Sequence, residues 1–397
     1  MTLRLDRTLI DEQKIQNLFD LIRDHYPLKE KVALHEPFID SLDEESVANC
    51  IRSSFVSSVG PEVDKFEKEI AHFTGRERAV AVVNGTSALH LALRLAGVGI
   101  GDLVITQALS FIATANAISY CGAAPIFVDV ALDSLGLCPD SLEQWLYANA
   151  ELDVNGVAKL KGSEGRIKAC VPVNIFGHPC QIEKICEICH RWNIEVVEDC
   201  AESLGSFKDN KHTGYRSRFA ILSFNGNKII TTGGGGAVLC SQKDYFAIKH
   251  LATTAKINMQ GHVEHDQIGY NYRLPNINCS LGISQIRKLK SIIEDKRRLA
   301  KKYIEFGSQN GFEFFQEPLT CKSNYWLNTL ICKDTVEVSA IQELSLAKNI
   351  ETRKAFKPIN EFLPYKNSLT DSLVNTKNFT SRLLNFPSGP NLNNYTT

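Results

Sequence analysis

One lysine in the sequence stands where its amine can become reactive. Lys228 ends the segment 221–228 (ILSFNGNK), and two isoleucines, two threonines and the glycines 233–236 follow it. Apolar neighbours can desolvate an amine, which lowers its pKa and makes it a nucleophile. The glycines permit unusual backbone conformations and close approach. Because the lysine precedes them and no Gly-Lys-Ser/Thr ending exists, the segment is not a phosphate-binding P-loop. A lone lysine would otherwise be a surface residue.

Carboxylates follow another apolar run. Val196 and Val197 lead into Glu198 and Asp199, with Glu202 three residues later. At the carboxyl end of a buried strand, such an acidic group can face a ligand. Helix capping or a salt bridge explains the same pattern equally well.

The segment Asn84-Gly85-Thr86-Ser87 ends an apolar run and precedes a helical one. A helix N-terminus presents free backbone N–H groups and the positive end of the helix dipole, which suits a phosphate. Thr86 could add a hydroxyl. The alternative is that Thr or Ser simply caps the helix.

The three segments suit one cofactor together. Pyridoxal phosphate needs a lysine for its aldehyde, a carboxylate for its pyridine nitrogen and backbone donors for its phosphate. Lys228, Asp199 and the segment 84–87 supply these groups, each at an expected strand end. The residues therefore favour a pyridoxal-phosphate enzyme.

The elements that must position these groups form an alternating series. Short apolar strands are expected at 79–83, 103–106, 125–130, 169–174, 195–198 and 220–224, with helices between most of them. This alternation predicts a mostly parallel, doubly wound α/β sheet covered by helices on both faces. Ligands of such sheets bind beyond the carboxyl ends of the strands.

Three parts of the chain are expected. Residues 1–31 form a helical N-terminal extension, 32–284 the large α/β domain and 285–397 a smaller C-terminal α+β domain. Helices are expected at 11–30, 41–54, 62–73 and 111–120, and a long basic helix from about residue 285. The stretch 150–167 interrupts the pattern and is expected to be a surface excursion.

Composition excludes several function classes. The 397 residues have a formal net charge of −1, which gives no basic footprint for nucleic acid. No apolar run is long enough to cross a membrane, and residues 1–7 lack the apolar core of a signal peptide. A cytoplasmic protein with reduced cysteines is therefore expected.

One cysteine motif could suggest a different cofactor. Cys186-Glu-Ile-Cys189-His190 matches the attachment pattern of c-type haem. It lies on an expected amphipathic helix in a chain with no export signal, and no second ligand pair follows at zinc-site spacing. Neither haem nor a metal is expected.

Ordered motifs give the sequence a family resemblance. From about Val32 to Pro387 it resembles the DegT-type sugar aminotransferases, which are fold type I pyridoxal-phosphate enzymes. The motifs that carry the resemblance are Phe66-Glu67, Asn84–His90, Ser110–Thr114, Glu198-Asp199, Ser223-Phe224 with Lys228, Gly233–Gly236 and Gly269–Arg273.

The resemblance implies roles around the cofactor ring. Lys228 would carry the cofactor as a Schiff base and act as the general base, and Asp199 would pair with the pyridinium nitrogen. Phe111 would stack on the ring. Glu202 would lie near the phenolic oxygen, where the family usually has Gln, so the hydrogen-bond polarity at that oxygen is open. A branch that has His instead of Lys228 dehydrates sugars, and Lys228 argues against that branch.

The resemblance also implies how the phosphate is held. Gly85, Thr86 and Ser223 would contact it, and Asn271 would reach it from a neighbouring subunit. A homodimer with shared active sites follows. Two further departures are Asn174, where a His is common, and the polar segment 278–282, where alanines are usual.

A narrower resemblance suggests a substrate. The segments Phe55–Gly60, Thr106–Leu109, Phe176–Pro179, Ser223–Lys228 and Asn324–Asn328 resemble the aminotransferases of legionaminic acid biosynthesis. The implied reaction transfers the amino group of L-glutamate to a UDP-linked 4-keto-6-deoxy-N-acetylhexosamine, most simply the glucosamine derivative. It would serve nonulosonic acid or surface polysaccharide biosynthesis.

Three alternatives remain open at this stage. The keto sugar could be linked to dTDP or GDP. The chain could be a non-catalytic, pyridoxal-binding regulatory protein, which the intact Lys228, Asp199 and Ser223 disfavour. A nucleotide-binding oxidoreductase is disfavoured because no Gly-x-Gly-x-x-Gly follows the first strand.

Overall fold

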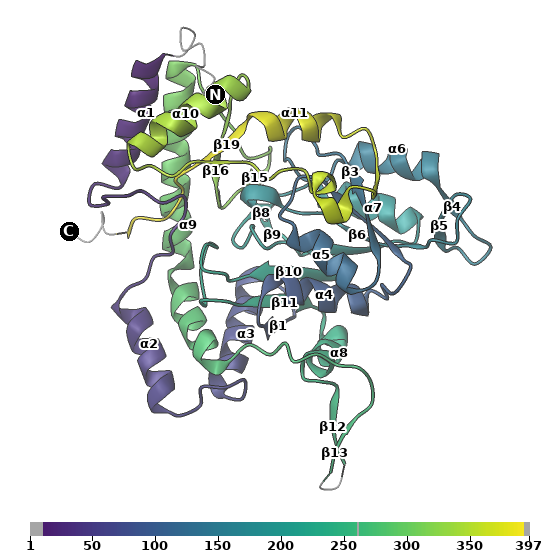
Figure 1. The fold of residues 1–397 in the computed structure, drawn as a ribbon. Coiled ribbons are helices and arrows are strands. Elements are labelled where there is room, and N and C mark those ends of the chain that lie inside the picture. Colours follow the sequence, from purple (N-terminus) through teal and green to yellow (C-terminus); the bar gives the residue numbers. More distant parts are fainter. Residues whose placement is uncertain (1–10, 260–261, 393–397) are drawn as a thin grey trace.

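The computed structural model describes residues 11–259 and 262–392. Residues 1–7, where the sequence predicts no signal peptide, lie outside these ranges. A mostly parallel sheet with helices on both sides forms the larger part, and a long helix joins it to a smaller part (Figure 1).

The central sheet has eight strands in the order β1-β11-β10-β7-β6-β2-β3-β18. β11 runs antiparallel to both neighbours, and the other neighbouring pairs from β10 to β18 are parallel. The expected mostly parallel α/β fold is thus confirmed. The strands are β1 (Arg78–Val82), β2 (Leu103–Gln107), β3 (Ala124–Val128), β6 (Ile167–Val171), β7 (Glu195–Asp199), β10 (Phe219–Ser223), β11 (Gly236–Cys240) and β18 (Leu369–Thr370).

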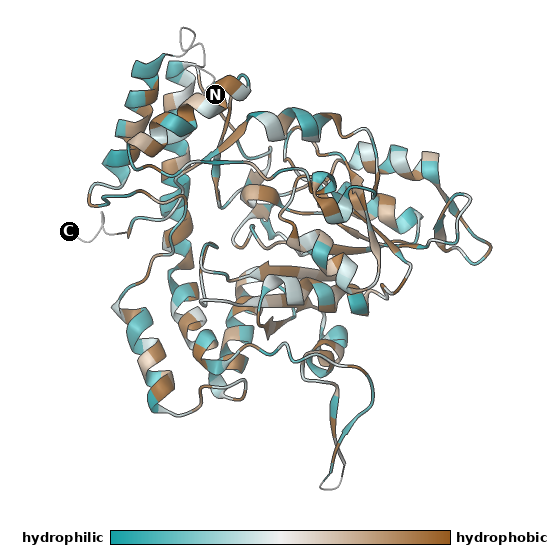
Figure 2. Ribbon diagram, in the orientation of Figure 1, coloured by the Kyte–Doolittle hydropathy of each residue, from teal (hydrophilic) through white to brown (hydrophobic). Residues whose placement is uncertain are grey.

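Both faces of the sheet are buried because helices pack on each of them. Successive side chains of a strand point to opposite faces and so join different clusters. Val104 of β2 joins the apolar cluster of the helices α4, α5 and α8, and Ile105 joins that of α6 and α7. Val197 and Val196 of β7 divide in the same way. Figure 2 shows the apolar residues concentrated along these strands. The helices are α4 (Gly85–Leu95), α5 (Ala113–Tyr120), α6 (Pro139–Asn149), α7 (Ile182–Arg191) and α8 (Gln242–Ala252).

The haem-like motif lies on α7. Cys189 is buried in the apolar cluster beneath this helix, and Cys186 packs against it. All twelve cysteines lie within the described residues as free thiols. No group of metal-binding side chains gathers anywhere in residues 11–259 and 262–392. Cys189 thus behaves as a small apolar residue.

The helix α9 (Asn276–Asn310) links the two parts of the molecule. It begins well before the expected residue 285 and runs unbroken through position 284. Its first half packs against α2 (Ser41–Arg52) and α3 (Pro61–Thr74), beside the large sheet. Its second half packs against α1 and the smaller sheet.

The smaller sheet has the order β14-β16-β19-β17. Helix α1 contributes to its core, since Ile15, Leu18, Phe19 and Ile22 are buried with Tyr303 of α9. The elements of this part are α1 (Glu12–His25), α10 (Thr335–Ala347), α11 (Val374–Arg382), β14 (Glu313–Phe314), β16 (Asn328–Ile331), β17 (Arg353–Lys354) and β19 (Leu383–Phe386).

Small hairpins and ribbons complete the structure. The expected surface excursion contains the β4–β5 hairpin, and a second hairpin, β12–β13, projects from the lower end of the molecule (Figure 1). These strands are β4 (Ala150–Leu152), β5 (Ala158–Leu160), β12 (Lys256–Met259) and β13 (His262–His265), and a three-stranded ribbon joins β8 (Phe207–Lys208), β9 (Lys211–His212) and β15 (Cys321–Lys322).

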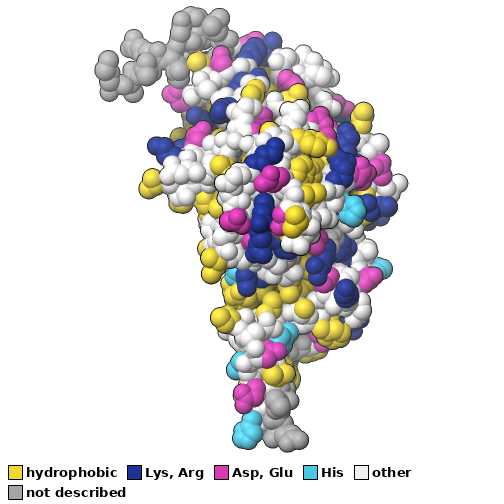
Figure 3. Space-filling model, turned by 90° about the vertical axis from the view of Figure 1, so that its right-hand side faces the viewer, with side chains coloured by type: hydrophobic (Ala, Val, Ile, Leu, Met, Phe, Trp, Pro, Cys, Tyr) yellow, Lys and Arg dark blue, Asp and Glu magenta, His cyan; other side chains and the backbone are white. Residues whose placement is uncertain are grey.

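Two further observations concern the charge of the surface and the length and polarity of the helices. On the face seen in Figure 3, Lys and Arg side chains alternate with Asp and Glu, without a field of one sign. Within the described ranges, every helix is too short or too polar to cross a bilayer.

A substitution in α1 tests whether this helix belongs to the core of the smaller part. Leu18 is fully buried. Leu18→Ala should lower the free energy of unfolding by about 2–5 kcal/mol, because it removes buried methyl groups and leaves a cavity. Urea unfolding followed by circular dichroism measures the change. Gln13→Ala, on the exposed side of α1, should change it little; equal effects of both variants would contradict the packing.

Candidate active site

Strand register brings three chain segments together at the carboxyl edge of the sheet. Gly236 lies opposite both Val82 of β1 and Ser223 of β10. A Cβ atom on Gly236 would come within 2.5 Å of the Asn84 carbonyl carbon, and one on Gly85 within 3.0 Å of the Ser223 Cβ. Glycine at these two positions therefore lets the start of α4 lie directly against the end of β10.

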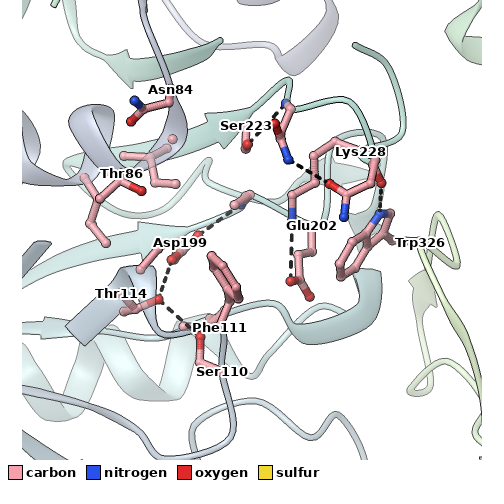
Figure 4. Close-up of a pocket in the computed structure, with 18 of the residues that line it drawn as sticks. Asn84, Thr86, Ser110, Phe111, Thr114, Asp199, Glu202, Ser223, Lys228 and Trp326 are labelled. Atoms are coloured by element: carbon pink, nitrogen blue, oxygen red, sulfur yellow. Dashed lines mark hydrogen bonds and ion pairs between the residues drawn. The ribbon is translucent and has the colours of Figure 1, made fainter. Parts of the chain in front are cut away.

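A cavity of about 290 Å³ opens at this edge. Figure 4 shows Lys228, Glu202, Asp199 and Ser223 pointing into it from neighbouring segments. The lining residues are Asn84, Gly85, Thr86, Leu89, Ser110, Phe111, Ala113, Thr114, Val173, Asp199, Ala201, Glu202, Ile221, Ser223, Asn225, Asn227, Lys228, Trp326, Arg353 and Phe356.

Lys228 follows β10 in a tight turn, in which its N–H donates to the Asn225 carbonyl. Its side chain is only 12% exposed, and Nζ lies 3.5 Å from Glu202 Oε1 and 3.9 Å from the centre of a Trp326 ring. Burial lowers the pKa of Lys228, while Glu202 and Asp199 oppose this effect. The result is a shielded amine that can exist in its neutral, nucleophilic form.

Asp199 ends β7, and both of its carboxylate oxygens accept hydrogen bonds. The Thr114 hydroxyl donates to Oδ2 at 2.9 Å, and the Ala201 N–H donates to Oδ1 at 3.1 Å. Burial raises the pKa of Asp199, whereas these two donors favour the charged form. The Thr114 hydroxyl lies 3.2 Å from that of Ser110. The carboxylate is therefore fixed in direction at the edge of the cavity.

Glu202 stands between Lys228 and the backbone of a neighbouring turn. Its Oε2 accepts a hydrogen bond from the Phe176 N–H at 2.8 Å, and its Oε1 faces Lys228. Burial raises the pKa of Glu202, and the charge of Lys228 opposes this effect. A neutral Gln here would lack the charge that pairs with the lysine.

At the opposite end of the cavity, Asn84 caps α4. Its side-chain oxygen accepts the Ser87 N–H at 2.7 Å. Neither Thr86 nor Ser87 is therefore the cap, and Gly85 and Thr86 face the cavity in the first turn of the helix. This turn offers backbone donors to an anion.

The remaining candidate residues are placed differently. Phe111 lines the cavity but is 54% exposed, with its ring 5.9 Å from that of Phe356 at a tilt of 54°. Asn271 is exposed, accepts a hydrogen bond from Arg273 at 3.0 Å and does not line the cavity. Its implied contribution from a neighbouring subunit stays a prediction.

The departures from the family pattern have local hydrogen-bond partners. The Asn174 amide donates to Glu198 and its oxygen accepts the Cys180 N–H. The Asn278 amide donates to the Thr232 carbonyl at 2.7 Å. Both residues therefore fix the backbone near the site.

No individual role was predicted from the sequence for two residues of the site. Thr114 and Trp326 lie within quoted motifs, but only the structure brings them to Asp199 and Lys228. Trp326 is held by its indole N–H, which donates to the Asn227 carbonyl at 2.7 Å. For Thr114, the feature of the sequence that could have indicated a role is its hydroxyl near the start of an expected helix.

The groups present fit pyridoxal phosphate. A buried lysine, a hydrogen-bonded carboxylate and a helix N-terminus face one cavity, and two glycines permit the close approach that shapes it. A mostly parallel α/β sheet with this set of groups defines a fold type I pyridoxal-phosphate enzyme.

Comparisons with known proteins agree with this class. The DegT/DnrJ/EryC1/StrS aminotransferase family matches residues 37–397. The EpsN protein of Bacillus subtilis is 34% identical over 334 residues, which cover 84% of this chain and 83% of that protein. GDP-perosamine synthase of Escherichia coli O157:H7 is 32% identical over 364 residues, which cover 91% and 94%.

A solved structure gives the same result. The DegT DnrJ EryC1 StrS aminotransferase from Brucella abortus matches with a TM-score of 0.79 and 25% identity, over 88% of this chain and 91% of that one. The chain therefore belongs to the DegT/DnrJ/EryC1/StrS aminotransferase family. It is a pyridoxal-phosphate-dependent aminotransferase.

Proposed function

We propose that this enzyme transfers the amino group of L-glutamate to the keto carbon of UDP-4-keto-6-deoxy-N-acetylglucosamine. The observation that carries the proposal is that Lys228 and Asp199 line the same cavity, where both could contact one cofactor. The choice of sugar rests on the resemblance of the motifs Phe176–Pro179 and Asn324–Asn328 to the aminotransferases of legionaminic acid biosynthesis.

One other nucleotide has specific support. A relative that matches 91% of this chain is named GDP-perosamine synthase. A GDP-linked 4-keto-6-deoxy sugar is therefore the second candidate substrate, with the same chemistry at the keto carbon.

The cofactor would be held at three places. Lys228 Nζ would be the point of covalent attachment, and the Asp199 carboxylate would accept a hydrogen bond from the protonated pyridine nitrogen. Gly85, Thr86 and Ser223 would hold the phosphate, and Asn271 of a second copy would complete this end in a homodimer. When bound, pyridoxal phosphate supplies a carbonyl that carries the amino group and a ring that accepts electrons from the reacting carbon.

The protein groups around the ring would set its orientation. Phe111 would cover one face, and Thr114 would keep Asp199 aimed at the nitrogen through the 2.9 Å hydrogen bond. Glu202 would face the phenolic oxygen with a charged or protonated carboxyl group instead of an amide.

Lys228 would also move protons. Its neutral Nζ would take the proton from Cα of glutamate, and in the second half of the cycle its protonated form would supply the proton at C4 of the sugar. Burial favours the neutral amine, and Glu202 stabilises the protonated form. The same lysine can thus act as base and as acid within one cavity.

A panel of nucleotide sugars tests the proposed substrate. The cofactor-loaded enzyme is supplied with glutamate and with UDP-, dTDP- or GDP-linked 4-keto-6-deoxy sugars, and the products are identified by mass. Fastest amination of the UDP-linked N-acetylated sugar supports the proposal. Preference for the GDP-linked sugar selects the second candidate, and turnover with none of them would contradict both candidate substrates.

Replacing Glu202 tests its influence on the lysine. Lys228 must be neutral to react with the cofactor aldehyde, so the rate of cofactor loading should rise with pH through the pKa of Lys228. Glu202 raises this pKa. Glu202→Gln should therefore move the midpoint to lower pH. The rate is followed by visible absorbance across a pH series.

The neighbouring carboxylate provides the control for this experiment. Glu198 bonds to Asn174, outside the cavity lining, and Glu198→Gln should leave the loading midpoint unchanged. A midpoint that stays constant or rises in Glu202→Gln would show that the Glu202 charge does not act on Lys228.

A further inference from the structure

An arginine from the smaller sheet reaches the wall of the cavity. Arg353 begins β17, where it pairs with Asn385 of β19. Its side chain lines the cavity together with Lys228, Glu202 and Trp326. The cavity is thus closed on this side by the smaller part of the molecule, which contributes a cation to it.

The guanidinium has unused donors. Arg353 Nε and Nη2 are buried, and neither has a hydrogen-bond partner among residues 11–259 and 262–392. Buried donors are nearly always paired in proteins, and an unpaired donor on a charged group is especially costly. Unpaired donors at a cavity wall therefore indicate a ligand-binding role.

The two carboxylates that act on Arg353 are engaged elsewhere. Glu202 accepts the Phe176 N–H and pairs with Lys228. Glu351 pairs with Lys31 at 2.6 Å and accepts the Leu34 N–H at 3.1 Å. Burial lowers the pKa of Arg353, and the charges of Glu202 and Glu351 partly offset this effect. Neither carboxylate accepts a hydrogen bond from Arg353 Nε or Nη2.

The aromatic ring of Phe356 supports the guanidinium. Arg353 Cζ lies 5.4 Å from the centre of this ring, and Phe356 stacks in turn on the buried Phe176 at 5.8 Å. Such a contact restricts the plane of the guanidinium. A restricted guanidinium presents its N–H groups as a fork, which matches the two oxygens of a carboxylate or the oxygens of a phosphate.

We propose that Arg353 binds the α-carboxylate of the amino donor. This inference rests on the proposed transamination, since it assigns a residue to one of its two substrates. The α-carboxylate is bonded directly to the carbon that reacts at Lys228, so its binding group must lie beside the lysine. Arg353 lines the same cavity as Lys228, and its charge contributes to lowering the pKa of that lysine.

The diphosphate of the sugar is the other anion that could use this fork. It is attached to C1, on the opposite side of the sugar ring from the reacting C4. With C4 at Lys228, the diphosphate would lie a ring width farther from the lysine. The placement of Arg353 in the same cavity wall as Lys228 and Glu202 therefore favours the carboxylate.

The two half-reactions separate these possibilities. In the first half-reaction, in which glutamate aminates the cofactor, Arg353→Gln should lower kcat/KM for glutamate by about 30-fold or more. A loss of this size is expected when one buried, charged, hydrogen-bonded pair is removed. The second half-reaction starts from the aminated enzyme and the keto sugar. Its kcat/KM should fall by a factor at least ten times smaller than that of the first. Both are followed by stopped-flow absorbance.

Two further readouts identify the anion. Glutarate, a dicarboxylate without an amine, should bind the cofactor-loaded wild type and bind Arg353→Gln about 30-fold more weakly by calorimetry. Wild type should prefer glutamate to 4-aminobutanoate, which lacks the α-carboxylate, and Arg353→Gln should lose at least tenfold of that preference. An unchanged preference, or a larger loss in the sugar half-reaction, overturns the proposal.

Adjacent and conservative variants provide the controls. Lys354 is the next residue of β17 and is exposed; Lys354→Gln removes the same charge and should leave both half-reactions unchanged. Should Arg353→Gln fail to load cofactor, Arg353→Lys makes the same test, since it keeps the charge but loses the fork. A wild type that forms no Schiff base refutes the transamination itself, whereas an active wild type matched by its Arg353 variants refutes only this inference.

Discussion

Lys228→Ala is expected to lower the rate of transamination on the order of 10⁴-fold or more. In the proposed role of Lys228, the substitution would remove the covalent attachment of the cofactor and the group that moves the proton, and general acid–base catalysis alone contributes about 10²–10⁴-fold. Single-turnover kinetics with glutamate measure the loss. The visible absorption that borohydride abolishes should disappear in the same variant.

The control for this variant is another partly buried lysine. Lys208 pairs with Glu183, as Lys228 pairs with Glu202, but it lies outside the cavity lining. Lys208→Ala should retain the borohydride-sensitive absorption and the rate. A Lys228→Ala enzyme that aminates a keto sugar at the wild-type rate would disprove the role of Lys228.

Asp199→Asn is expected to lower the rate by about 10²–10³-fold. Asparagine has nearly the same shape but carries no charge, so a protonated pyridine nitrogen would lose its partner in a buried site. Loss of one partner of a buried charged pair costs about 2–5 kcal/mol, and each 1.4 kcal/mol corresponds to tenfold. The affinity for pyridoxal phosphate, measured by fluorescence titration, should also fall.

A comparison within the same strand controls for general effects on the fold. Glu198→Gln changes the adjacent buried carboxyl group, which contacts Asn174. It should affect thermal stability more than the rate. If Asp199→Asn and Glu198→Gln reduce the rate equally, the loss reflects damage to β7 and not the pyridine nitrogen.

The strand-end chemistry could be predicted because it depends on local patterns. Apolar runs end at Val82, Asp199 and Ser223, and parallel strands bring their carboxyl ends to one edge. The expected strands and most helices accordingly lie close to the observed ones. Strand β11 departs from the expected parallel arrangement, and this affects only its pairings with β1 and β10.

Features that depend on distant contacts could not be predicted. At the start of helix α9, the buried Asn276 side chain accepts the N–H groups of Glu62 and Val63 and donates to the Phe55 carbonyl, which ties this end of the helix to distant parts of the chain. The periodic basic pattern starts later, which led to the expected start at about 285. Trp326 reaches Lys228 only because the smaller part packs across the cavity.

The identity of the cofactor-binding lysine can be measured directly. The cofactor-loaded wild type is reduced with borohydride and digested, and the modified peptide is sequenced by mass spectrometry. The proposal predicts a phosphopyridoxyl group on Lys228 alone. The most informative competitor is Lys296, whose pKa burial lowers to about 7 but whose amine is enclosed against the carbonyls of Trp326 and Ser388. Modification at Lys296, or at no lysine, would contradict the assignment of Lys228.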